Sequence, residues 1–146
     1  MTSPDVRLSA AVKTTLLADA HAATRGEPTE ICGILSGRAD DETQSPIISA
    51  FHSVTNVASD TRRAYELDPA ETIEQIDELE SAGDTLVGFY HSHPVSPAEP
   101  SQADREQAAW PGYLYAIASV PDNDIAVFEW TGETFAPRTV RIVEAD

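Results

Sequence analysis

The chain has one cysteine and one lysine among its 146 residues. A single cysteine, Cys32, excludes an internal disulfide and favours an intracellular protein, because disulfides persist mainly in oxidising compartments. No apolar run approaches the ~20 residues that a membrane-spanning helix needs. The N-terminal stretch does not resemble a secretory signal either, because Lys13 and Asp19 interrupt it. We therefore expect a cytoplasmic protein with no membrane partner.

Positive charge is also scarce. Lysine and arginine total 9 against 25 aspartates and glutamates, which gives a net charge of −16. Nucleic-acid backbones are bound by basic patches, so no nucleic-acid partner is expected. One interpretation is an ordinary acidic protein. The other, which we favour, is a protein of a halophile, because in molar salt the Debye length falls to about 3 Å and the self-repulsion of the acidic residues is screened.

Apolar periodicity and glycine or proline breaks divide the chain into helices and strands. Helices are predicted at 8–25, at 68–82 and at 101–109. Strands are predicted at 29–37, 46–57, 85–93, 113–120, 125–131 and 135–143, with a polar turn at 38–45, a surface loop at 58–67 and a turn at 121–124. This order predicts an α/β fold in which helices pack on the faces of a mixed sheet, and the length fits a single domain over residues 1–146.

The first two predicted helices carry recognisable caps and apolar stripes. Ser9 is the expected N-cap of the first, whose buried face would contain Leu8, Val12, Leu16 and Leu17. Asp68 is the expected N-cap of the second, and Gly83 would end it. The buried face of this second helix would contain Ile73, Ile76 and Leu79.

Residues 91–104 carry the strongest chemical pattern. His91 and His93 lie two apart at the end of a strand and so project from one face. Ser101 can cap the following helix, and Asp104 lies one turn further along the same face. Two imidazoles and a carboxylate can form a tetrahedral zinc site whose fourth position holds a water. Each pair also has a simpler interpretation. His91 and His93 could be ordinary core or surface histidines, and Ser101 and Asp104 could form a capping box without further chemistry. The occurrence of both pairs within one short stretch favours the metal site.

The same residues resemble the signature of the JAMM (MPN-plus) metalloprotease family, without a gap or substitution: His91, His93, Pro94, Ser101 and Asp104. The family also has a glutamate at the start of an upstream strand, and Glu30 resembles it. The resemblance implies the MPN fold, a curved mixed sheet flanked by helices. It implies one Zn²⁺ per chain, Glu30 as general base and Ser101 as a hydroxyl donor to the oxyanion.

The resemblance further implies a zinc isopeptidase that cleaves ubiquitin-like modifiers after their C-terminal Gly-Gly, releasing target lysines. In an archaeon the partners would be small archaeal modifiers and their lysine-linked conjugates, and Arg62 and Arg63 are candidate contacts. Two alternatives remain: processing of the C-terminus of a sulfur-carrier protein, and a scaffold without catalysis. Cys32 lies in an apolar strand, which favours a core residue over a nucleophile.

Overall fold

The computed structural model describes residues 5–39 and 46–144. Part of the predicted 38–45 turn, residues 40–45, lies outside the described residues. The elements follow in the order β1 (Val6–Ser9), α1 (Ala10–Ala22), β2 (Cys32–Ala39), β3 (Pro46–Val54), α2 (Pro69–Ser81), β4 (Thr85–His93), α3 (Gln102–Gln107), β5 (Leu114–Ser119), β6 (Asp124–Trp130), β7 (Phe135–Arg138) and β8 (Val140–Val143).

All the strands join one mixed sheet in the order β7-β6-β5-β4-β2-β3-β1-β8. Neighbouring strands are antiparallel except for the pairs β1–β3, β1–β8 and β4–β5, which are parallel. The α/β class and the mixed sheet predicted from the sequence are therefore confirmed. β4, which ends in the two histidines, lies at the centre between β2 and β5.

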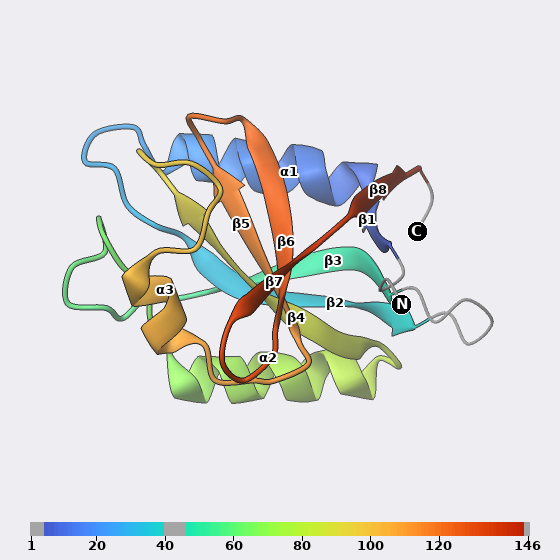
Figure 1. Ribbon diagram of the computed structural model, residues 1–146. Coiled ribbons are helices and arrows are strands. Elements are labelled where there is room, and N and C mark those ends of the chain that lie inside the picture. The colour runs from blue at the N-terminus through green and yellow to red at the C-terminus, as the bar shows by residue number, and fades with distance from the viewer. Residues whose placement is uncertain (1–4, 40–45, 145–146) are drawn as a thin grey trace.

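The sheet is strongly curved, and the connection between β7 and β8 requires it. These strands occupy opposite edges of the sheet, yet only Thr139 separates them. In a flat sheet of eight strands the edges would lie roughly 34 Å apart, whereas two Cα steps span about 7.6 Å. The sheet curls so that β7 continues into β8 across its front (Figure 1), and Val6 N donates to Thr139 O at 2.8 Å.

Helices α1 and α2 cover opposite faces of the sheet (Figure 1). One apolar cluster joins Leu16 of α1 to Leu35 and Tyr90 of the sheet. A second cluster joins Leu79 of α2 to Ile34 and Phe89. Consecutive residues of β2 and β4 thus enter different cores, as the period-two alternation of strands requires. In the described residues, no helix combines the length and apolar character needed to cross a membrane.

Two predicted boundaries of the first helix were wrong. Ser9 is its N-cap, accepting from Val12 N, but residues 6–9 form β1 and the helix ends at Ala22. Leu8 is buried as expected, although in a strand. β1 exists because it pairs in parallel with β3 and β8, which are distant in sequence. Four residues carry no local periodicity that would reveal such pairing.

In α2 the caps were predicted correctly and one core residue was not. Asp68 accepts from Glu71 N at 3.1 Å, and Gly83 follows the helix with φ +89°. Leu79 is buried, but Ile73 is 62% exposed. Thr72 beside it is buried instead, and both residues line a surface hollow.

Several strand boundaries differ from the prediction by one or two residues, and three differences are larger. β2 begins at Cys32 rather than at residue 29, and β3 ends at Val54 rather than at residue 57. The strand predicted over 135–143 is divided at Thr139 into β7 and β8. The first two differences matter for the site, because they leave Glu30 and Asn56 outside the strands, where both bond with the 58–67 loop.

Candidate metal centre

The end of β4 places two histidines side by side. His91 and His93 project from one face of the strand, and their Nε2 atoms lie 3.2 Å apart. Both residues are buried. Ser92, between them, points to the other side, where its Oγ accepts from Ile31 N at 2.8 Å. Pro94 ends the strand, as its missing N–H predicts. The alternation expected from the sequence is confirmed.

The start of α3 brings a carboxylate to these imidazoles. Ser101 Oγ accepts from Asp104 N at 3.1 Å, and Asp104 Oδ2 accepts from Ser101 N at 2.9 Å, which completes a capping box. The same carboxylate contacts His91 Nε2 through Oδ1 at 3.0 Å and His93 Nε2 through Oδ2 at 2.9 Å. The Asp104 side chain thus completes the helix cap and also contacts both imidazoles. One potential ligand atom from each of the three residues lies within 4.8 Å of the others, so the group could hold a metal ion.

The hydrogen bonding of His93 fits either a protonated ring or a metal ion at this point. Its Nδ1 lies 2.7 Å from the carbonyl oxygen of Pro97, which can only accept, so Nδ1 carries a proton. In a neutral ring Nε2 then presents a lone pair towards Asp104 Oδ2, which is also an acceptor. Two acceptors at such a distance need a proton or a metal between them. Histidine ligands commonly donate their second nitrogen to a carbonyl in this way, so the residues fit a divalent metal.

The pKa values of the three groups follow from burial and mutual contact. Burial acts to raise the pKa of Asp104, but hydrogen bonds from His91 and His93 outweigh it and hold that pKa well below its usual range. Burial acts to lower the pKa of His93, but its bonds to Asp104 and Pro97 raise it overall. Burial dominates at His91 and lowers its pKa, which favours the neutral ring that a metal requires.

Glu30 lies beside this cluster, just before β2. Its side chain is buried, and among the described residues its Oε1 has no hydrogen-bond partner. Burial, together with the negative charge of Asp104, raises the pKa of Glu30 to about 8, although His93 partly opposes the rise. A carboxyl group with this pKa can both accept and return a proton near neutral pH.

Ser101 lies at the rim of the centre and is exposed. Because its oxygen accepts the capping bond from Asp104 N, its own hydroxyl hydrogen stays free to donate. Cys32 lies opposite His91 in the β2–β4 register. Burial raises the pKa of this thiol to about 12, so the thiolate needed for nucleophilic attack is not available.

Sequence reasoning missed Tyr65. This tyrosine is buried and lies flat against His91, with ring centroids 4.2 Å apart and planes inclined by 14°. It belongs to the predicted 58–67 loop, which has no periodicity. The only available signal was an aromatic residue in a polar segment. Arg62 and Arg63 of this loop are exposed and both approach Asp60, so their contact with a substrate stays a prediction.

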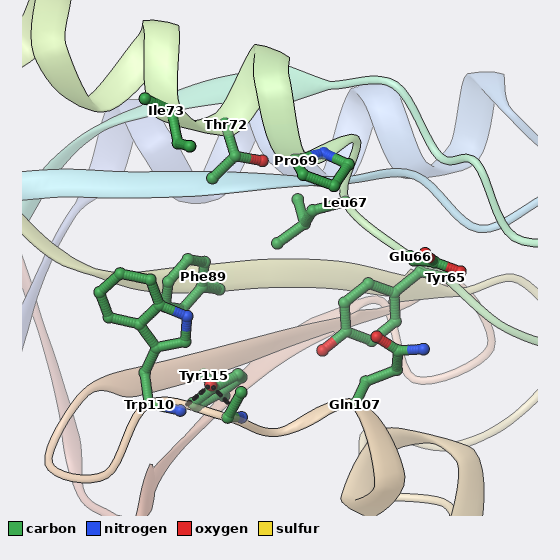
Figure 2. A pocket seen from close by; sticks show the side chains of 11 residues that line it. Tyr65, Glu66, Leu67, Pro69, Thr72, Ile73, Phe89, Gln107, Trp110 and Tyr115 are labelled. Atoms are coloured by element: carbon green, nitrogen blue, oxygen red, sulfur yellow. Dashed lines mark hydrogen bonds between the residues drawn. The ribbon is translucent and has the colours of Figure 1, made fainter.

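A hollow of about 380 Å³ adjoins the centre through Tyr65. It lies between the first turns of α2 and the segment after α3, with Phe89 of β4 at its floor (Figure 2). Trp110 borders it and is 42% exposed, and Ile73 borders it from α2. Tyr115 fixes the 109–110 backbone at the edge of the hollow, because its hydroxyl oxygen accepts hydrogen bonds from Ala109 N and Trp110 N at 3.2 Å each.

The curved mixed sheet, with a His-His-Asp cluster able to hold a metal at the junction of a central strand and a short helix, is the arrangement of a JAB-type domain. Residues 10–131 match the family described as prokaryotic homologs of the JAB domain. The chain belongs to this family, and the resemblance noted in its sequence is confirmed.

Several relatives agree with this membership. The chain is 46% identical over 143 residues to a desampylase from Haloferax volcanii, covering 97% of this chain and 99% of that one. It is 33% identical over 106 residues to a CysO-cysteine peptidase from Mycobacterium tuberculosis, covering 70% and 66%. It is 35% identical over 86 residues to a probable TtuB-protein conjugate cleaving protease from Thermus thermophilus, covering 59% and 53%.

Solved structures share the fold. A solution structure of a Desulfitobacterium hafniense protein superposes with a TM-score of 0.83 at 24% identity, covering 96% of this chain and 94% of that one. A crystal structure of a JAB1/MPN domain protein from Archaeoglobus fulgidus superposes with a TM-score of 0.62 at 19% identity, covering 95% and 100%.

Proposed function

We propose that this protein is a zinc-dependent isopeptidase that releases ubiquitin-like modifiers from lysines, cutting after the C-terminal Gly-Gly of the modifier. The observation that carries the proposal is the convergence of His91, His93 and Asp104 beside a buried glutamate whose Oε1 has no hydrogen-bond partner among the described residues. The 46% identity to a desampylase over nearly the whole chain supports it. A buried acid of raised pKa next to three candidate metal-ligand groups favours catalysis over a scaffold role.

Zinc is the metal that this donor set suits. Two imidazoles and one carboxylate leave one coordination position open, which is the arrangement of catalytic rather than structural zinc sites. When bound, zinc supplies Lewis-acid chemistry that polarises a carbonyl and lowers the pKa of a water to about 7. One ion per chain is expected, because the described residues contain one such group of ligands.

Glu30 and Ser101 take the remaining roles. Glu30 accepts the proton of the attacking water and delivers it to the departing lysine amine, a task that its raised pKa suits. Ser101 donates its free hydroxyl hydrogen to the oxygen of the scissile carbonyl as negative charge develops there. Both residues act from fixed positions: Glu30 from a buried site just before β2, and Ser101 from the N-cap of α3.

The hollow beside Tyr65 is the proposed seat of the modifier. Tyr65 contacts His91 on one face and lines the hollow with its edge, so a modifier held there brings its tail to the metal centre. The exposed Ile73 and Trp110 suit an apolar patch on that partner (Figure 2). A Gly-Gly tail fits the path from the hollow to the metal centre, because glycines can lie extended in a narrow passage where side chains would clash.

Cleavage of a defined conjugate tests the proposal. The substrate is a Gly-Gly-tailed modifier linked to a lysine, and its partner substrate carries a bulky residue in place of the penultimate glycine. We expect cleavage of the first substrate alone, abolished by a chelator and restored by zinc. Equal cleavage of both substrates, or degradation of unrelated unfolded proteins, would identify a general protease.

A second function is supported by the 33% identity to a CysO-cysteine peptidase. In this alternative the enzyme trims the C-terminus of a sulfur-carrier protein instead of cleaving lysine conjugates. The two activities share the Gly-Gly tail and differ in the group that leaves. Comparing the kcat/KM of one modifier linked to a lysine side chain and to the amine of cysteine separates them, and we expect the lysine linkage to be preferred.

The working environment is proposed from the charge. A net charge of −16 with one lysine, together with the Haloferax relative, supports a halophilic protein of the cytoplasm, where small archaeal modifiers would be its partners. An acidic modifier would gain no long-range attraction to this surface, so short-range contacts, with Arg62 and Arg63 among the candidates, would decide recognition.

A further inference from the structure

The backbone of Glu30 is held by a loop rather than by the sheet. Glu30 precedes β2, and its N–H donates to Thr61 O at 2.7 Å. Its carbonyl accepts from Asn56 Nδ2 at 3.0 Å. The next residue, Ile31, is fixed to β4 by Ser92, whose Oγ and N–H both bond its backbone. The position of the buried carboxyl group therefore depends on the 55–67 segment.

Asn56 is the residue that unites this segment. Its side-chain N–H groups donate to Glu30 O at 3.0 Å and to Ala64 O at 3.1 Å. Its side-chain oxygen accepts from Ala58 N and from Glu66 N, each at 3.0 Å. Two carbonyls face the nitrogen and two N–H groups face the oxygen, so the orientation of the amide is unambiguous and all four of its main bonding positions are used.

The four bonds connect both parts of the metal centre. The bond to Glu30 holds the proposed general base, while those to Ala64 and Glu66 bracket Tyr65, which lies against His91. An isolated bridge between Asn56 and Leu67 closes the same loop. The Asn56 side chain thus holds the backbone of Glu30 and the residues on either side of Tyr65 in fixed positions relative to each other.

We propose that Asn56 is the positioning residue of the catalytic centre, which sets the Glu30 carboxyl group relative to the metal ligands and holds the loop that supports His91. The inference rests on the proposed isopeptidase activity. Asn56 touches neither substrate nor metal in this account. It acts through Glu30 and Tyr65, so its loss should impair the chemical step more than metal binding.

Two substitutions of Asn56 distinguish the bonds that its side-chain nitrogen donates from those that its side-chain oxygen accepts. Asn56→Asp keeps the oxygen that accepts from Ala58 N and Glu66 N, but it removes both donors and faces Glu30 O with a carboxylate. Asn56→Ala removes all four bonds without adding charge. The chain has one other asparagine, Asn123, which contacts His21 in an exposed turn, so Asn123→Asp and Asn123→Ala are matched controls.

The kinetic test uses the lysine-linked Gly-Gly substrate and zinc-loaded protein. For Asn56→Asp we expect kcat to fall on the order of 10- to 100-fold, the usual cost of losing a residue that orients a catalytic group. KM should stay within about twofold and zinc content unchanged, because the loop keeps the two bonds that the side-chain oxygen accepts from Ala58 N and Glu66 N. Asn56→Ala should lower kcat and raise KM together. The Asn123 variants should match wild type. Folded Asn56→Asp protein with wild-type kcat would overturn the proposal.

Amide hydrogen exchange gives a measurement that needs no activity. In the metal-free wild-type protein the N–H groups of Ala58, Glu66 and Glu30 should exchange slowly. Asn56→Asp should leave Ala58 and Glu66 protected and speed exchange at Glu30, because a carboxylate that faces Glu30 O weakens the adjacent bond from Glu30 N to Thr61 O. Asn56→Ala should speed exchange at all three. Fast exchange of Ala58 and Glu66 in wild type would overturn the proposal even if neither variant folds. Wild-type protein that fails to cleave the substrate would instead count against the proposed function.

Discussion

Tyr65 stacks on the ring of His91 at a centroid separation of 4.2 Å, so a residue of an irregular loop packs against a candidate metal ligand. The contact fixes the plane of the imidazole. Nδ1 of His91 has no hydrogen-bond partner among the described residues, so the stacking on Tyr65 restrains the ring together with the contact between Nε2 and Asp104 Oδ1. Zinc affinity should therefore depend on Tyr65.

We predict that Tyr65→Ala weakens zinc binding on the order of 10- to 100-fold, the range seen when a residue that orients a metal ligand is lost. Tyr65→Phe keeps the ring and should bind zinc like wild type. Competition with a fluorescent zinc chelator measures both affinities. If Tyr65→Ala binds zinc as tightly as Tyr65→Phe, the stacking does not position His91.

Glu30 should make the stability of the metal-free protein depend on pH. Its pKa of about 8 in the native state exceeds the ordinary 4.5 of the unfolded chain. Between these values the native state holds a proton that the unfolded state has released, so stability falls as pH rises from about 4.5 to about 8. Glu30→Gln removes this loss.

The melting temperature of Glu30→Gln should therefore match wild type near pH 4.5 and exceed it increasingly towards pH 8. Exposed Glu99 offers a control of the same charge change, and Glu99→Gln should show no such trend. A constant difference between Glu30→Gln and wild type across this range would mean that the native carboxyl group titrates normally.

Ser101→Ala should separate catalysis from metal binding. The variant keeps the Asp104 carboxylate and the Ser101 N–H bond to it, so zinc content should be unchanged. Loss of the capping oxygen should cost about 1 kcal/mol of stability, and loss of the oxyanion donor should reduce kcat on the order of 10²- to 10³-fold. Thermal unfolding and steady-state kinetics measure the two effects. A variant that is less stable but fully active would leave Ser101 with the capping role alone.

Molar salt should stabilise the protein. The acidic side chains that give the net charge of −16 repel one another in dilute buffer. The repulsion is strong along α2, where Glu74 lies three residues from Asp77 and four from Glu78. We expect the melting temperature to rise steadily from 0.1 M to 2 M KCl. A flat or falling curve would remove the halophilic interpretation and leave the metal centre unaffected.

The three candidate ligands could be predicted because their geometry is local. His91 and His93 share a face by strand alternation, and Asp104 follows its cap by one helical turn, so neither relationship depends on distant pairing. Glu30 was suggested by family resemblance alone. Its approach to the ligands comes from the pairing of Cys32 with His91 across β2 and β4, which no local pattern encodes.

The features that escaped prediction all depend on long-range contacts. β1 exists only through its pairing with β3 and β8, and the break at Thr139 follows from closure of the curved sheet. Ile73 has the spacing of a core residue but faces a hollow formed by a segment more than 30 positions away. Asn56 and Tyr65 lie in a loop whose order comes from side-chain bonds, for which the sequence shows no periodicity.

Zinc titration of metal-stripped protein tests the central claim most directly. Activity on the lysine-linked Gly-Gly substrate is measured as zinc is added in fractions of an equivalent. We predict no turnover without metal, a linear rise to one zinc per chain and a plateau beyond it, with Asp104→Asn protein remaining inactive at the same zinc concentrations. Full turnover in the metal-free protein, or full activity of Asp104→Asn, would contradict the assignment of His91, His93 and Asp104 as the catalytic metal centre.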